Sequence, residues 1–260
     1  MRGRIIKIAG LIGLIAIVVY GNIRREESIV QGVVVVIDYD GGDTLIRAKT
    51  LEEHIMKTLP QLGGQRVKEI DEAAVEAAAA TSPYIAASQV SVSSGAKIVV
   101  HARQRRPIVR MYYQDKEFYI DEEGRCVPES EEGEYDCIVG SGHFRQKMGK
   151  GYRKLDIAEM RRDSVKRGYD IVGVWEVAKY IDEHEEWRDH FDQIYREKNR
   201  ELVLIPAEGS YRVIIGEAEG IEEKLRRYAR FRDKVLPRKG WDYYKAVNLK
   251  YAGQVVAQKR

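Results

Sequence analysis

The residues that most often carry catalysis or hold metals are few in this sequence, and their spacing assembles no site. Five histidines and two cysteines occur among 260 residues. Glu186 and His190 are four positions apart, which places two side chains on one face of a helix, but their charged neighbours predict a solvated face instead. No His-Glu-x-x-His, Cys-x-x-Cys, Gly-x-Ser-x-Gly or Walker motif occurs. We therefore predict that the chain is not an enzyme and uses no cofactor, metal or small-molecule substrate.

The two cysteines and one glycine-containing motif are also considered as functional sites. Cys126 and Cys137 could pair in an oxidising compartment and would stay reduced in the cytosol, and the sequence leaves both states open. Two cysteines are too few to form a disulfide framework. Gly140-Ser141-Gly142 is predicted to be a turn rather than a loop that cradles phosphate.

Composition and charge place the chain among ordinary folded proteins. Hydrophobic residues make up 44% of the chain, and 44 basic side chains oppose 41 acidic ones to give a net charge of +3. This balance does not indicate a nucleic-acid-binding protein. At ~100–200 residues per domain, the length favours two modest domains over one large one.

The N-terminal segment predicts a single transmembrane anchor. Basic residues at positions 2, 4 and 7 precede an unbroken apolar run from Ile8 to Tyr20. A spanning helix needs ~20 residues, and Arg4–Ile23 meets that length. The leading positive charges predict a cytoplasmic N-terminus and exported domains after it. A cleaved signal peptide is the alternative, although Val19-Tyr20-Gly21 has no A-x-A character.

The first exported segment predicts a small α+β unit with the order β-α-α-β-β. Its pattern is built from β-branched runs, an alanine-rich helix and Gly or Pro breaks. The expected elements are a strand at Val33–Ile37, a helix that opens at a Thr50–Glu53 capping box and stops at Pro60, a helix at Ile70–Ala80, and strands at Ile85–Ser91 and Ala96–Arg103.

The remaining chain predicts a mostly antiparallel β domain with amphipathic helices. The expected elements are strands at Ile108–Tyr113 and Phe118–Ile120, a helical region at Trp175–Tyr195, strands at Leu202–Ile205 and Tyr211–Ile215, a helix at Ile221–Leu236, and strands at Tyr244–Tyr251 and Gln254–Gln258. Between Arg145 and Arg167, nine bases oppose three acids. This basic stretch is either a solvated insertion or a surface for an anionic polymer or lipid.

The element order and several motifs resemble known proteins. The order β-α-α-β-β is that of a POTRA domain. Ser82-Pro83-Tyr84-Ile85 resembles the entry to the second strand in the FtsQ/DivIB family of cell-division proteins. Gln104-Arg105-Arg106-Pro107 is similar to that family's Glu-Arg-x-Pro exit from the third strand, with Gln104 in place of the glutamate.

The second half carries more of the resemblance, and its matches follow the family's order. They resemble FtsQ-like proteins of the Bacteroidota type. The matching stretches are Trp187…Gln193-Ile194-Tyr195, Leu204-Ile205-Pro206…Gly209, Ile214-Ile215-Gly216, Glu223-Lys224-Leu225, Gly240-Trp241 and Val247-Asn248-Leu249-Lys250-Tyr251…Gln254-Val255-Val256. The basic stretch from Arg145 to Arg167 is longer than the family's usual connection.

The resemblance implies a function in cell division. We expect a cytoplasmic tip and anchor at 1–28, a POTRA domain at 29–107 and a β domain at 108–260. FtsQ-like proteins are non-enzymatic scaffolds of the division septum in the inner membrane. They bind the periplasmic parts of FtsB and FtsL and so regulate septal peptidoglycan synthesis. The alternatives are a POTRA-containing polypeptide transport component and an exported cell-wall enzyme, for which the sequence lacks further POTRA units and a catalytic constellation, respectively.

The resemblance also implies where the partner binds. Tyr251 falls at the family's partner-contacting tyrosine, or else packs its ring in the core. The terminal strand is expected to lie at a sheet edge that accepts a strand from FtsB. Its predicted contact residues are Gln254, Val255, Val256, Ala257 and Gln258, with Val255 and Ala257 on one face. Proline at Val256 should remove a backbone donor there. Arg105 either contacts a partner or only ends a strand.

Overall fold

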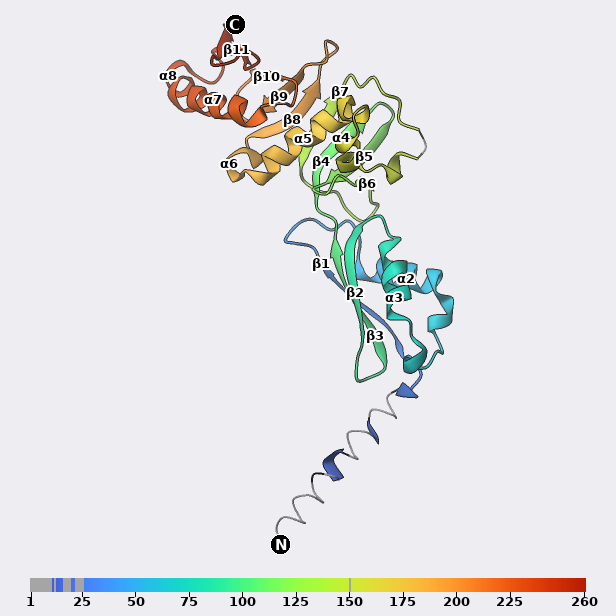
Figure 1. The fold of residues 1–260 in the computed structure, drawn as a ribbon. Coiled ribbons are helices and arrows are strands. Elements are labelled where there is room, and N and C mark those ends of the chain that lie inside the picture. The colour runs from blue at the N-terminus through green and yellow to red at the C-terminus, as the bar shows by residue number, and fades with distance from the viewer. Residues whose placement is uncertain (1–10, 12, 16–19, 22–25, 150) are drawn as a thin grey trace. The chain divides into compact units, whose positions relative to one another are not determined.

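The computed structural model describes residues 11, 13–15, 20–21, 26–149 and 151–260 (Figure 1). The chain divides into two compact units, Met1–Arg105 and Arg106–Arg260. The predicted transmembrane anchor, residues 4–23, falls mainly outside the described residues. Among the residues that are described, no helix has the length and apolar character to cross a membrane.

The first unit has the element order β-α-α-β-β. Its elements are β1 (Gly32–Asp38), α2 (Ala48–Thr58), α3 (Glu72–Ala80), β2 (Ile85–Val92) and β3 (Lys97–Gln104), with short 3-10 turns at Pro60–Leu62 and Val67–Glu69. In the described part of this unit the strands form one sheet in the order β1-β3-β2. β1 runs parallel to β3, and β2 runs antiparallel to it. The predicted helices and strands of this segment are therefore present, with shifted ends.

The start of α2 corrects the predicted capping box. The helix begins at Ala48 after an extended Arg47, so Thr50 lies inside its first turn and not at the N-cap position. Leu45 and Ile46 are buried directly before it, which fixes the entry of the chain. Their N–H groups donate to the buried side-chain oxygen of Gln104 at 2.7 and 3.2 Å.

The second unit is built on one large mixed sheet. Its strands are β4 (Pro107–Tyr113), β5 (Lys116–Asp121), β6 (Cys126–Pro128), β7 (Ile138–Gly142), β8 (Phe191–Arg196), β9 (Leu202–Pro206), β10 (Arg212–Gly216), β11 (Tyr244–Asn248) and β12 (Val256–Lys259). Across the described residues they form a nine-stranded sheet in the order β12-β11-β10-β9-β8-β7-β4-β5-β6. Most neighbouring pairs are antiparallel, but β4-β7, β7-β8 and β10-β11 are parallel.

Helices pack against this sheet, and the hydrophobic core lies between them and the strands. They are α4 (Ile157–Arg162), α5 (Asp170–Glu183), α6 (Glu185–Arg188), α7 (Ile221–Lys234) and α8 (Leu236–Lys239), with 3-10 turns at Tyr152–Lys154 and Lys166–Gly168. α5 contacts β4, β8 and α7. Its apolar side chains and those of α7 join the strand residues in one hydrophobic cluster. The unit is thus mixed α+β.

Two segments differ from the sequence prediction. The helical region expected at Trp175–Tyr195 ends at Arg188, and β8 follows. A register shift between Phe191 and Gln193 lets Phe191 and Ile194 both face the core, although they are three positions apart. That spacing is what suggested a helix.

The predicted turn at Gly140-Ser141-Gly142 is instead part of β7. A Cβ at Gly140 would lie 2.5 Å from the Met111 sulfur and 2.9 Å from a Val174 methyl carbon. A Cβ at Gly142, where φ is +118°, would lie 2.3 Å from the Arg196 carbonyl oxygen. Glycine occurs in this strand because neighbouring groups approach its backbone closely.

Candidate partner-binding edge of the sheet

β12 is the last strand of the large sheet. It pairs antiparallel with β11, and the register aligns Asn248 with Val256 and Val247 with Ala257. Within the described chain no strand lies on its other side. An edge strand presents unpaired N–H and C=O groups that can template another strand. β12 therefore has the position that was predicted for the terminal strand, but it begins at Val256 rather than Gln254.

Two hydrogen bonds establish which backbone groups face the open edge. The Leu249 N–H donates to the Ile214 carbonyl of β10 at 2.8 Å, so the N–H and C=O groups of Asn248 face β12 by alternation. The Arg260 N–H donates to the Tyr243 carbonyl at 3.3 Å, in agreement with that alternation. Ala257 consequently directs its N–H and C=O groups to the open side.

The same register corrects one expectation. Val256 is paired with Asn248 and directs its backbone N–H toward β11, not outward. Proline at Val256 would therefore disturb the pairing inside the sheet. Ala257 is the position where proline removes a donor from the open edge.

The side chains of the predicted contact residues divide between the core and solvent. Val255 and Ala257 are partly buried and pack against the hydrophobic cluster, whereas Val256 is 45% exposed. Gln254 and Gln258 are exposed as well. Tyr251 is 50% exposed, so its ring does not pack in the core. Tyr251 and β12 thus form one accessible strip of surface.

The rim of this strip is basic. The ring of Tyr243 lies between two lysines, with the ammonium groups of Lys239 and Lys259 at 6.0 and 5.6 Å from its centroid. Lys245 and Arg260 are also exposed. Positive charge at a short edge strand discourages unspecific strand pairing.

Arg105 belongs to a different unit from the other predicted contact residues. It is the last residue of the first unit, whereas β12 belongs to the second. Its N–H donates to the Tyr84 carbonyl at 2.8 Å, which ties the end of β3 to the segment before β2. The structure places Tyr251 and the β12 residues together in the second unit.

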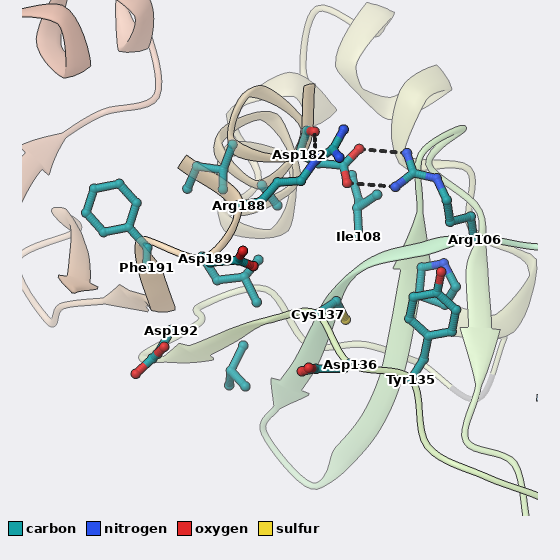
Figure 2. A pocket seen from close by; sticks show the side chains of 15 residues that line it. Arg106, Ile108, Tyr135, Asp136, Cys137, Asp182, Arg188, Asp189, Phe191 and Asp192 are labelled. Carbon is teal, nitrogen blue, oxygen red and sulfur yellow. Dashed lines mark hydrogen bonds and ion pairs between the residues drawn. The ribbon is translucent and has the colours of Figure 1, made fainter. Parts of the chain in front are cut away.

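A polar cavity of about 580 Å³ lies elsewhere in the second unit (Figure 2). The Arg106 guanidinium forms two hydrogen bonds of 2.7 Å with the Asp182 carboxylate, and Arg188 donates to the Asp182 carbonyl at 2.6 Å. The hydrogen bonds that Arg106 donates to Asp182 raise the pKa of its guanidinium. These charges are used in structural ion pairs. In the described residues, no group of three or more His, Cys, Asp or Glu side chains is arranged to hold a metal ion.

His190 and the two cysteines were also candidates in the sequence, and the structure shows their contacts. The His190 ring nitrogen hydrogen-bonds to the Tyr228 hydroxyl at 2.8 Å, and that hydroxyl lies 2.6 Å from the hydroxyl of Tyr211. Burial lowers the pKa of His190 to about 4. No disulfide joins Cys126 and Cys137, both of which are described residues.

The molecule so described is an α+β protein whose nine-stranded sheet, within the described residues, is open at one edge. A family model for the FtsQ/DivIB, C-terminal related domain matches residues 106–258, from the first residue of the second unit to β12. The chain therefore belongs to the FtsQ/DivIB family, which comprises non-enzymatic cell-division proteins. This membership supports a role in cell division and indicates the division septum as its location. A search of curated proteins found no match.

Proposed function

We propose that this chain is a septal scaffold that binds the periplasmic parts of FtsB and FtsL and couples them to septal peptidoglycan synthesis. The observation that carries the proposal is the open edge of β12, which lies inside the segment that matches the family. The alternative of a polypeptide transport component has less support, because the match covers the whole sheet domain rather than a transport module.

The proposed binding mode is strand addition. A segment of FtsB would lie beside β12 and exchange hydrogen bonds with the outward N–H and C=O groups of Ala257. The exposed side chains of Val256 and Gln258 would contact alternate side chains of the added strand. Tyr251 would contribute apolar area and a hydroxyl at the end of the strip, as aromatic residues do in protein interfaces.

The first unit and the N-terminus complete the proposal. We interpret the β-α-α-β-β unit as a POTRA domain and residues 4–23 as an inner-membrane anchor with a cytoplasmic N-terminus. The anchor would keep both units in the periplasm near the membrane segments of FtsB and FtsL. Arg105, the last residue of the first unit, is proposed as a second contact with a partner.

The test is a pull-down of the full-length chain, in mild detergent, with the periplasmic parts of FtsB and FtsL. Tyr251→Glu should abolish capture, because it places a charge where a half-exposed ring would be covered. Tyr112→Glu is the matched control, since that tyrosine is 42% exposed but lies on β4. Equal loss in both variants, or no capture by the unmodified chain, would contradict the proposal.

A further inference from the structure

We propose that Arg227 is a positioning residue that holds the partner-binding edge in its binding geometry without touching the partner. The inference rests on the proposed function, since it concerns the same edge. Arg227 lies in the middle of α7, and its side chain is 9% exposed. Nothing in the sequence singles it out from the other arginines of that helix.

The guanidinium of Arg227 collects the carbonyl groups of one loop. Nη1 donates to the Tyr251 carbonyl at 2.6 Å and to the Gln254 carbonyl at 2.5 Å. Nη2 donates to the Leu249 carbonyl at 2.8 Å. One side chain therefore fixes three points of the connection between β11 and β12, including the backbone of Tyr251 itself.

Arg227 holds the part of this loop that lies furthest from the strands. The Leu249 and Lys250 N–H groups at its start are bonded to Ile214 and to the Asn248 side chain, but the bond from the Gln254 N–H to the Tyr251 carbonyl is long at 3.4 Å. Hydrogen bonds from a charged donor are about twice as strong as those between neutral groups. The carbonyls turned toward Arg227 would lose these partners if the guanidinium were removed.

The charge of Arg227 is compensated mainly by carbonyl dipoles. The nearest carboxylate, on Glu223, lies 3.7 Å from Nε, which is within ion-pair range but is not a hydrogen bond. Arg226, the neighbouring residue, is 62% exposed and pairs with the same glutamate. The two adjacent arginines thus differ in role, since one binds the loop and the other faces solvent.

The rest of α7 provides a rigid base. Leu225, Tyr228 and Phe231 are buried in the hydrophobic cluster, so the helix is fixed to the sheet on the side from which Arg227 projects. The Tyr228 hydroxyl is also held between His190 and Tyr211. Arg227 therefore ties the middle of the loop to the core, while its start is held by the Leu249 N–H bond to Ile214 and by the ion pair of Lys250 with Glu201.

The test uses the full-length chain with Arg227→Met, Arg227→Lys and the control Arg226→Met. Methionine keeps much of the apolar stem and removes the donors, whereas lysine keeps the charge and part of the donor capacity. Amide hydrogen exchange is measured along the chain, and affinity is measured for the periplasmic segment of FtsB. Exchange in β8 and β9 reports whether the sheet stays folded.

Arg227→Met should speed exchange across the loop and β12 by about tenfold or more, leave β8 and β9 protected, and weaken FtsB binding by about tenfold. Arg227→Lys should restore part of both, and Arg226→Met should change neither. Unchanged exchange in β12, or binding equal to that of Arg226→Met, would overturn the inference. If the unmodified chain does not bind FtsB, the partner assignment fails, and the exchange data alone decide whether Arg227 orders the loop.

Discussion

The two edges of the nine-stranded sheet, as the described residues form it, are finished in opposite ways. At one end, all three residues of β6 are buried. At the other end, β12 has no buried residue, and Val256 is almost half exposed. The two strands are similarly short, so length does not explain the difference. What differs is whether the chain covers its own edge.

The cover over β6 comes from the segment that follows β7. The Ile157 N–H donates to the Gly124 carbonyl at 2.7 Å, and Arg125 forms a β-bridge with Asp156. The ring of Tyr152 lies 5.0 Å from that of Phe118. β6 also ends in proline, which has no N–H to offer. The basic stretch between Arg145 and Arg167 thus includes a structural cover for one edge, while the other stays accessible.

The largest expected effect on stability comes from removing the buried carboxylate that holds the start of this covering segment. The Asp170 carboxylate is fully buried, accepts from the Arg145 N–H at 2.9 Å, and lies 2.8 Å from Nη2 of the buried Arg196. Asp170→Asn should lower the free energy of unfolding by about 3–5 kcal/mol, because it leaves the Arg196 charge buried without its partner. Urea denaturation measures this change.

A matched control uses the same arginine. Glu217 lies 3.9 Å from Nη1 of Arg196 but is 60% exposed, so Glu217→Gln should change stability by less than about 1 kcal/mol. Burial raises the pKa of Asp170, but the Arg145 N–H and the Arg196 charge lower it further, below the ordinary value. The stabilisation by the ionised Asp170 carboxylate should therefore be complete above pH 3.8 and decline as the pH falls below it. Equal losses in the two variants would contradict this account.

The closed edge also predicts the reactivity of its cysteine. Burial raises the pKa of Cys126 to about 12. In the folded protein its alkylation by iodoacetamide should therefore be about a hundredfold slower, or more, than in the denatured chain. Mass spectrometry of the labelled peptide measures the rate. Asp170→Asn should speed the alkylation of Cys126, because the covering segment is loosened. Rapid labelling of the unmodified folded chain would show that β6 is not covered.

The open edge is tested by two neighbouring prolines. Ala257→Pro should weaken FtsB binding by about tenfold, because it removes the outward N–H while β12 stays paired with β11. Val256→Pro should instead speed exchange in both β11 and β12, since its N–H belongs to the sheet. The measurements are FtsB affinity and amide exchange. If Ala257→Pro binds normally, the added strand does not use this edge.

The smallest effect at neutral pH concerns His190, which contacts the helix that supports the open edge. Burial, with a contribution from the Arg232 charge, lowers the pKa of His190 from 6.5 to about 4. Between these two pH values His190 is protonated in the unfolded chain but not in the folded chain. The free energy of unfolding should therefore decline as the pH falls from 6.5 to about 4. Denaturation midpoints at several pH values test this, and His190→Gln should flatten the slope in that range.

Much of the fold followed from local patterns in the sequence. The β-branched run at Val33–Ile37 and the alternation along 254–258 both predicted strands that are present. The patterns failed where a distant contact overrides them. Gly140 lies in a strand paired with β4 and β8, where Met111 and Val174 leave no room for a Cβ, and Phe191 and Ile194 share a face only through a register shift.

The candidate site was predictable in part. The resemblance at Val247–Val256 indicated Tyr251 and the terminal strand, and the structure places both at an exposed edge. The direction of the Val256 N–H depends on the register with β11, which no local pattern encodes. Arg227 left no signal either, because its partners are backbone carbonyls 22 to 27 positions away, and carbonyls carry no sequence identity.

The covered β6 strand has a consequence for stoichiometry. A sheet with two open edges can add strands at both ends, and copies of such a chain can join into an unlimited row. Here the side chains and the segment that cover β6 block one end, so under the proposed binding mode the large sheet would accept a single added strand. This sheet is therefore monovalent for strand addition, and recruitment through it should give complexes of defined size rather than filaments.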